Sequence, residues 1–178
     1  MALAGLQQGV AADEEHRLAG LAKDLVAEFR KTKIFLSGQD VTEAVRDEAC
    51  GNRASDVARL PAVRKALLAR QRAFRQPPGL VAEGRDMGTV VFPDAKLKVF
   101  LTASIEERAR RRYKQLIDKG IHATLAPLFR DLAERDARDA ARAAAPLAAA
   151  PDAVQIDATN LTVDSVVERV LGEYRERA

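Results

Sequence analysis

The stretch GLVAEGRDMGTVVFPDAKLKVFLT, residues 79–102, decides the fold class that we predict for this chain. It contains a short apolar run at 80–82, a polar loop with glycines at 84 and 88, and a second apolar run at 97–101. The first run is typical of a buried parallel strand. A glycine-bearing loop at the carboxyl end of such a strand is where α/β proteins bind ligands. The stretch therefore predicts a strand, a ligand-binding loop and a second strand.

The chain that follows alternates between helices and strands. Ser104 and Glu107 form a capping box that predicts the start of a helix, and Gly120 predicts its end. A helix over 124–143, a strand at 154–156 and a last helix capped by Thr162 come next. This alternation predicts an α/β fold with a parallel sheet flanked by helices.

The first part of the chain does not alternate in this way. Apolar residues at helical spacing predict a helix over 14–30, followed by a strand at 33–36 and a turn at 37–40. Residues 42–50 and 61–74 are predicted to be helical. We therefore divide the chain into residues 1–78, which include an inserted lobe, and an α/β core at 79–178.

Composition excludes several classes of protein. With 47% hydrophobic and 31% charged residues among 178, the chain is not intrinsically disordered. The single cysteine, Cys50, and two histidines make an internal disulfide impossible and a Cys/His zinc site untenable. The sequence shows no secretory signal and no membrane-spanning stretch, so we expect a cytoplasmic location and no membrane partner.

The loop at 83–89 carries three candidate ligands. Glu83 is placed to hold a water of a bound Mg²⁺, Arg85 to hold a phosphate, and Asp86 to accept a proton from an exocyclic amine. The alternative is an Arg–Asp pair that only braces a tight turn.

A second candidate set lies in the helix predicted over 124–143. Arg135, Asp139 and Arg142 are spaced by four and three residues, which puts them on one helical face. On spacing alone a surface charge ladder is the favoured interpretation. Asp136 lies elsewhere on the helix and is predicted to be solvated.

The third set is an arginine cluster at 108–112, which includes Arg108 and Arg111. Such a cluster suits neutralisation of a transferred phosphoryl group. It also suits a nucleic-acid patch, although 4% aromatic residues argue against base stacking. Ser55 and Arg64 have no local mark of function.

Several motifs are absent from the 178 residues. The sequence contains no G-x-x-x-x-G-K-[ST], no G-x-G-x-x-G and no G-x-S-x-G. Reasoning from the residues alone therefore ends at an α/β protein with an arginine-rich anion site.

Longer motifs resemble the bacterial cytidylate kinase family. The resemblance runs through the opening stretch, ERARRRYKQL at 107–116, ERDARD at 134–139 and IDAT at 156–159. Upstream it includes GNRAS at 51–55, VRKAL at 63–67 and RQRAF at 70–74, so that it covers almost the whole sequence.

This resemblance implies a nucleoside monophosphate kinase: a P-loop-kinase-like parallel sheet, a monophosphate-binding insertion, and a mobile lid around 108–142. Such enzymes transfer the γ-phosphoryl group of ATP to CMP or dCMP with Mg²⁺. By the family pattern, Ser55, Arg64 and Asp86 read the cytosine ring. Arg135 and Asp139 hold the ribose, while Arg85 and Arg142 lie near the monophosphate. Arg108 and Arg111 border the lid and, with Arg85 and Arg142, assist catalysis.

The resemblance also implies small-molecule nucleotides as the only partners, no nucleic acid, and a monomer. It begins after the family's first strand and phosphate loop, and that strand is central to the family's sheet. We therefore expect a truncated kinase with negligible turnover of its own. The alternatives are a non-catalytic nucleotide- or RNA-binding module and an unstable fragment.

Overall fold

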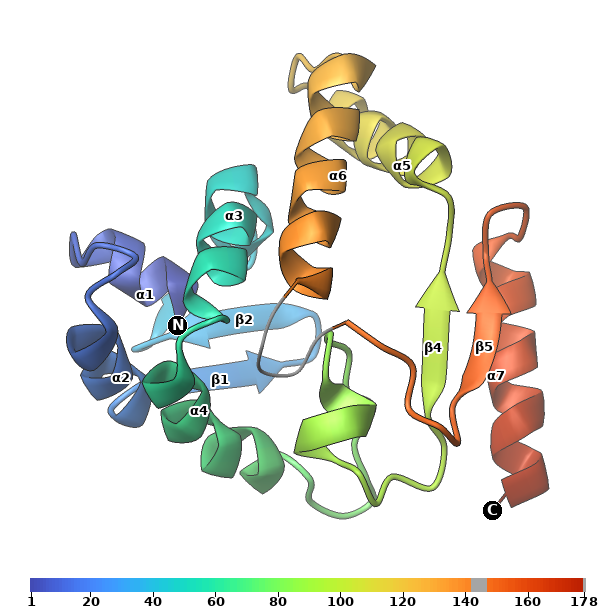
Figure 1. Cartoon of the computed structure of the whole chain (residues 1–178), viewed down its shortest axis with the longest axis horizontal. Helices are drawn as coiled ribbons and strands as arrows, with labels where there is room; N and C mark the ends of the chain where they lie inside the picture. Colours follow the sequence, from blue (N-terminus) through green and yellow to red (C-terminus); the bar gives the residue numbers. More distant parts are fainter. Residues whose placement is uncertain (142–146, 178) are drawn as a thin grey trace. The chain divides into compact units, whose positions relative to one another are not determined.

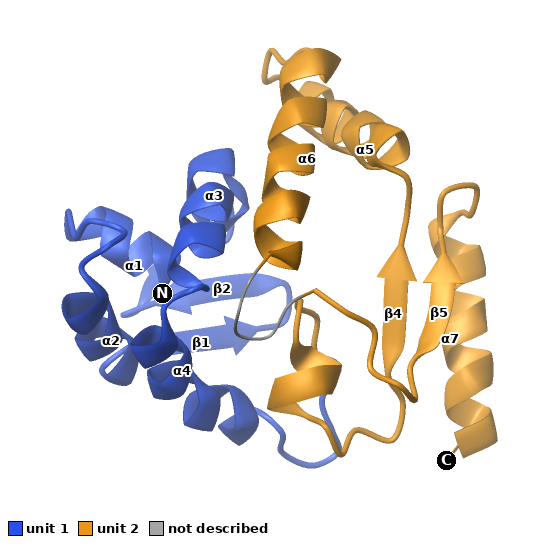
Figure 2. Ribbon diagram, viewed as in Figure 1, with its two compact units in different colours: residues 1–81 blue, residues 82–178 orange. Residues whose placement is uncertain are grey.

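The chain forms two compact units, residues 1–81 and 82–178 (Figure 2). The structure, a computed structural model, describes residues 1–141 and 147–177. Within these ranges no helix is both long and apolar enough to cross a membrane. Each unit is described by itself below.

Five helical segments and a small sheet make up the first unit. The helices are α1 (Ala2–Gln7), α2 (Glu15–Lys23), the 3₁₀ turn η1 (Ala44–Arg46), α3 (Glu48–Val57) and α4 (Pro61–Ala73). Leu18 on α2 and Val63 on α4 are 0% and 1% exposed, and they anchor a core that also includes Cys50 and Val57. Pro61 occupies the first turn of α4, as predicted, because its missing N–H has no partner there in any case.

The sheet of this unit corrects one prediction. Residues 24–30 are not helical: β1 (Ala27–Arg30) pairs antiparallel with β2 (Lys33–Leu36), which pairs with β3 (Gln39–Asp40). The helical spacing that includes Phe29 misled the prediction, because Phe29 is 61% exposed and stacks edge-on with Phe74 at 5.3 Å. Hydrogen bonds to β2, which no helical periodicity predicts, fix residues 27–30 as a strand.

The second unit is α/β, which confirms the predicted fold class. It contains the single π-turn η2 (Met87–Val91), β4 (Val99–Thr102), α5 (Ile105–Asp118), α6 (Leu125–Ala140), β5 (Val154–Asp157) and α7 (Val163–Arg177). Strands β4 and β5 lie side by side and run parallel, with Val99 opposite Val154 and Thr102 opposite Asp157 (Figure 1). Helix α7 follows β5 directly, as a parallel sheet flanked by helices requires.

The helix ends of this unit follow the predicted local signals. The Ser104 hydroxyl accepts a hydrogen bond from the Glu107 N–H at 3.2 Å and caps α5. Gly120 takes a φ of 73°, the left-handed conformation that ends a helix. Thr162 Oγ1 accepts from the Ser165 N–H at 3.2 Å at the start of α7.

The strand predicted at 80–82 does not form. Residues 80–82 have no regular secondary structure, and the Leu80 and Val81 side chains are 43% and 101% exposed. A buried parallel strand needs a neighbouring strand to accept its backbone hydrogen bonds. Among the described residues the only parallel ladder joins β4 to β5, so this run has no neighbour to pair with.

Candidate functional site

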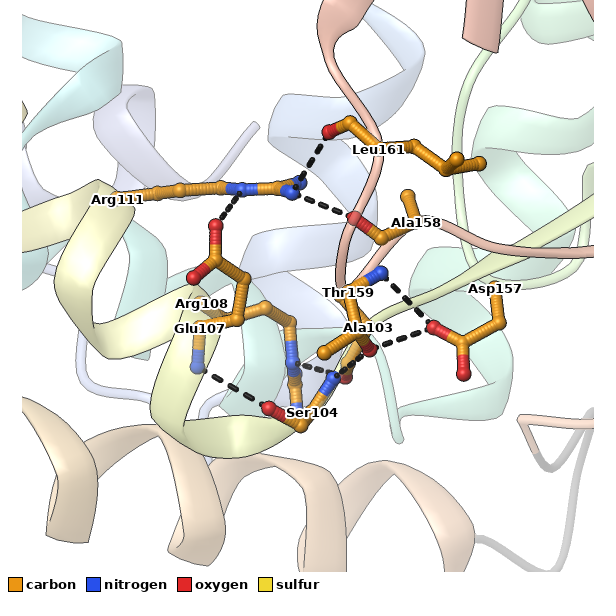
Figure 3. Close-up of polar contacts among 9 residues, drawn as sticks. All are labelled: Ala103, Ser104, Glu107, Arg108, Arg111, Asp157, Ala158, Thr159 and Leu161. Atoms are coloured by element: carbon orange, nitrogen blue, oxygen red, sulfur yellow. Dashed lines mark hydrogen bonds and ion pairs between the residues drawn. The ribbon is translucent and has the colours of Figure 1, made fainter. Parts of the chain in front are cut away.

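The carboxyl ends of β4 and β5 carry a connected set of polar side chains (Figure 3). Thr159 Oγ1 accepts from the Ser104 N–H at 2.9 Å and donates to Asp157 Oδ1 at 2.5 Å. The Thr159 N–H also donates to Asp157 Oδ1, at 2.9 Å. The Thr159 hydroxyl, followed by its backbone N–H, lowers the pKa of the Asp157 carboxyl. These contacts fix the backbone at the edge where parallel sheets bind ligands.

Arg111 on α5 is committed to the loop that follows β5. Its Nη2 donates to the carbonyl oxygen of Ala158 at 2.6 Å and, at 3.4 Å, to that of Leu161. Its Nε donates to Glu107 Oε1 at 2.8 Å (Figure 3). In this structure Arg111 therefore ties α5 to the loop between β5 and α7, and its predicted catalytic role stays a prediction.

Arg108 joins α5 to α6. Its Nη1 donates to Asp136 Oδ1 at 3.0 Å, and its Nη2 pairs with Asp136 Oδ2. Its Nε donates to the Ala103 carbonyl at 3.1 Å. Asp136 is 25% exposed, so the prediction that it is simply solvated was wrong. The packing of α5 against α6, which the sequence alone does not show, brings the two side chains together.

The most buried charged side chain of this unit's described residues is Asp139 on α6, at 1% exposure. Arg85, from the loop before η2, places its Nε 3.0 Å from Asp139 Oδ2. The Arg85 Nη2 also lies 4.0 Å from Asp136 Oδ1. Arg85, Asp136, Asp139 and Arg108 thus form an alternating chain of charges, which we call the Arg–Asp network. A surface ladder, the favoured interpretation from spacing alone, does not describe a buried Asp139.

Arg135 lies one turn before Asp139 on the same helix. Its Nε is buried and has no hydrogen-bond partner. Buried polar atoms without partners are rare in proteins and often mark a position that a ligand completes. Arg142, the third residue predicted on this face, lies outside the described residues.

The loop at 83–89 brings Arg85 to the network but leaves Glu83 apart. Asp86 precedes η2, and its carbonyl accepts from the N–H groups of Val90 and Val91 at 2.9 and 3.2 Å. Single π-turns of this kind are frequent at functional sites. Glu83 is exposed, and no three potential metal ligands gather anywhere in 1–141 and 147–177. A lone carboxylate suits only an Mg²⁺ that is held mainly by nucleotide phosphates and water.

Ser55 and Arg64 belong to the first unit. Ser55 on α3 is 5% exposed, and Arg64 on α4 donates from Nη1 to the Ala58 carbonyl at 3.3 Å. The prediction that Ser55 is a cap or loop residue was wrong, because it lies inside α3. Arg53, on the same helix, has a buried Nη1 without a hydrogen-bond partner.

Sequence reasoning missed Asp136 and Arg53. Asp136 lies in the same ERDARD run as Arg135 and Asp139, so an acid beside two candidate ligands was the available signal. Arg53 lies in GNRAS, two residues before Ser55. Neither carries a mark of its own, since burial and pairing are properties of the packed helices.

Comparison with known proteins decides the family. The model of the cytidylate kinase family matches residues 1–176. The chain belongs to the cytidylate kinase family. A cytidylate kinase of Azotobacter vinelandii is 55% identical, covering 99% of this chain and 80% of that relative. A cytidylate kinase of Burkholderia ambifaria is 57% identical, covering 98% of this chain and 76% of the relative.

A third relative agrees. A cytidylate kinase of Bordetella bronchiseptica is 55% identical over 98% of this chain and 78% of its own length. Both units of this cytidylate kinase chain fall within these matches. The resemblance seen in the sequence is therefore confirmed, and the chain is of the nucleoside monophosphate kinase class of enzyme.

Proposed function

We propose that this chain binds CMP or dCMP as part of a kinase that transfers the γ-phosphoryl group of ATP to it and yields CDP or dCDP. The observation that carries the proposal is the Arg–Asp network on α6. Asp139 is buried and paired with Arg85, and Arg135 beside it has a buried Nε without a partner. Carboxylate and guanidinium groups fixed together suit the hydroxyl and phosphate groups of a nucleotide.

Each group has a chemical task in this proposal. Asp139 accepts hydrogen bonds from ribose hydroxyls, and Arg135 donates to the same sugar. Arg85 holds the monophosphate, and Arg142 assists it. Asp86 accepts from the exocyclic amine of cytosine, while Ser55 and Arg64 of the first unit bind the base. Phosphoryl transfer depends mainly on positioning and positive charge, so such a set needs no nucleophile from the protein.

Mg²⁺ enters this proposal with ATP. Its chemistry is to neutralise charge on the phosphates, and Glu83 is the residue that we propose for one of its water ligands. We further propose that residues 1–78 include the monophosphate-binding lobe and that the lid lies around 108–142. A cytoplasmic monomer completes the proposal.

CMP binding is the test, because the 178 residues contain no phosphate-loop motif for ATP. Calorimetry should show binding of CMP and dCMP in preference to AMP. Asp86→Ala and Asp139→Asn should each weaken CMP binding, whereas Asp131→Asn, an exposed acid on α6, should not. Equal CMP affinity in all four proteins would remove the site. Coupled turnover near ~1–100 s⁻¹ would contradict the expectation that this chain alone is inactive.

The RNA-binding alternative has less support. Arg108 and Arg111, the arginines on which it depends, already donate to carboxylates and backbone carbonyls. RNA binding with a steep salt dependence and no preference for CMP would favour it instead.

A further inference from the structure

Asp136 lies between two arginines of the network. Its Oδ1 accepts from Arg108 Nη1 at 3.0 Å, and the Nη2 of Arg85 lies 4.0 Å from the same oxygen. Its Oδ2 pairs with the other terminal nitrogen of Arg108. A single carboxylate therefore serves as counter-ion to both side chains.

Both arginines are also held from a second side. Arg108 Nε donates to the Ala103 carbonyl at 3.1 Å, and Arg85 Nε lies 3.0 Å from the buried Asp139 (Figure 3 shows the first contact). A guanidinium group has five N–H donors, and the printed contacts of Arg108 use three of them. Each arginine is thus fixed in one rotamer and keeps donors for a further acceptor.

Fixing two cations side by side requires a compensating charge. Without an acid between them, two guanidinium groups repel each other and lose their common geometry. A ligand anion would then have to order both side chains on binding, at a cost in conformational entropy. With the acid present that ordering is already complete, which favours binding of the anion.

We infer that Asp136 is a positioning residue, whose carboxylate holds Arg85 and Arg108 ready to bind the phosphate of the nucleotide. This inference rests on the proposed function, since it takes the ligand to be CMP. Asp136 itself contacts no ligand in it. It acts through the two arginines.

The inference predicts a change of affinity opposite in sign to simple charge repulsion. Asp136→Asn removes a negative charge near the bound phosphate, and by repulsion alone CMP should bind more tightly. If the carboxylate positions the arginines, CMP should bind more weakly. Cytidine lacks the phosphate, so its affinity should change little in either case. The ratio of the cytidine Kd to the CMP Kd isolates the contribution of the phosphate.

Calorimetry of CMP and cytidine, at one fixed salt concentration, tests the inference. We expect Asp136→Asn to lower this ratio about tenfold, because a charge-assisted hydrogen bond is worth about that factor. Asp131→Asn removes the same charge from an exposed position on α6 and should leave the ratio unchanged. Arg108→Lys keeps the positive charge but cannot bridge both oxygens of Asp136, so it should lower the ratio too.

The outcomes separate the two hypotheses. If the unsubstituted chain binds CMP no better than cytidine, the proposed phosphate site fails, and this inference with it. If it prefers CMP and Asp136→Asn keeps or raises the ratio, the inference alone is overturned. An equal fall in Asp131→Asn overturns it as well. Should Asp136→Asn fail to fold, Arg108→Lys decides by the same ratio.

Discussion

Removing Arg85 should destabilise the second unit more than removing its partner Asp139. Asp139 is 1% exposed and Arg85 is 37% exposed, with 3.0 Å between Nε and Oδ2. Arg85→Met takes a cation away from a buried carboxylate that water cannot reach. Asp139→Asn instead leaves a guanidinium that water solvates, and its amide oxygen still accepts a hydrogen bond.

The magnitudes follow from this difference in exposure. Breaking a fully buried ion pair from one side costs about 3–5 kcal/mol. Because Arg85 is more than one-third exposed, we reduce this to about 1–3 kcal/mol for Arg85→Met. Asp139→Asn loses one hydrogen bond to a charged group, with an expected cost of about 1 kcal/mol.

Urea unfolding followed by tyrosine fluorescence measures this difference. Both tyrosines of the chain, Tyr113 and Tyr174, lie in the second unit, and the sequence has no tryptophan. The signal therefore reports the unit that contains the network. Arg85→Met should lower the urea midpoint by about 1 M. Arg110→Met removes an exposed cation from α5 and should change stability by less than about 0.5 kcal/mol.

The refuting results are specific. A larger loss in Asp139→Asn than in Arg85→Met would show that burial of the carboxylate does not control the cost. Equal losses in Arg85→Met and Arg110→Met would show that the ion pair with Asp139 contributes nothing.

Three further predictions concern other parts of the chain. Ser104→Ala removes the cap of α5 and should destabilise the second unit by about 1 kcal/mol in the same urea assay, and an unchanged midpoint would refute a role for the cap. The Thr42 hydroxyl and N–H, with Lys33, lower the pKa of Asp40 to about 2, so NMR titration should find that value and Thr42→Val should raise it. Because this pKa is depressed in the folded state, its contribution to stability is present above the ordinary aspartate pKa and is lost as pH falls toward about 2. Burial raises the pKa of the Cys50 thiol, so iodoacetamide at pH ~8 should label it slowly until urea unfolds the first unit, and rapid labelling of the native chain would contradict its burial.

Features encoded by neighbouring residues were predicted well. The caps at Ser104 and Thr162, the proline that opens α4 and the glycine that ends α5 each act within a few residues of the chain. Capping and turn preferences are local physical effects, so a single sequence is enough to read them.

Features that depend on distant partners were predicted poorly. Residues 27–30 become a strand because residues 33–36 pair with them, across a turn in which Lys31 takes a φ of 54°. No glycine, asparagine or aspartate marks that turn in the sequence. The apolar run at 80–82 failed in the opposite sense, since its composition fits a strand but no neighbour pairs with it.

The candidate site shows the same division. Spacing placed Arg135 and Asp139 one turn apart, and the structure places both on α6. It did not show that Arg85, more than fifty residues earlier, pairs with Asp139. The ligand roles came from the family resemblance, which carries information about a bound nucleotide that helical periodicity lacks.

The arginines of the second unit differ in what they are able to release. Arg111 would have to leave the carbonyls of Ala158 and Leu161 to reach a phosphate, and each buried acceptor left without a donor costs about 1–3 kcal/mol. Arg135 has the opposite balance, because its buried Nε gains a partner when a ligand binds. Arg85 keeps one-third of its side chain exposed while Asp139 holds its Nε. Charge counting treats these three residues alike, but hydrogen-bond satisfaction assigns Arg85 and Arg135 to the ligand and Arg111 to the scaffold.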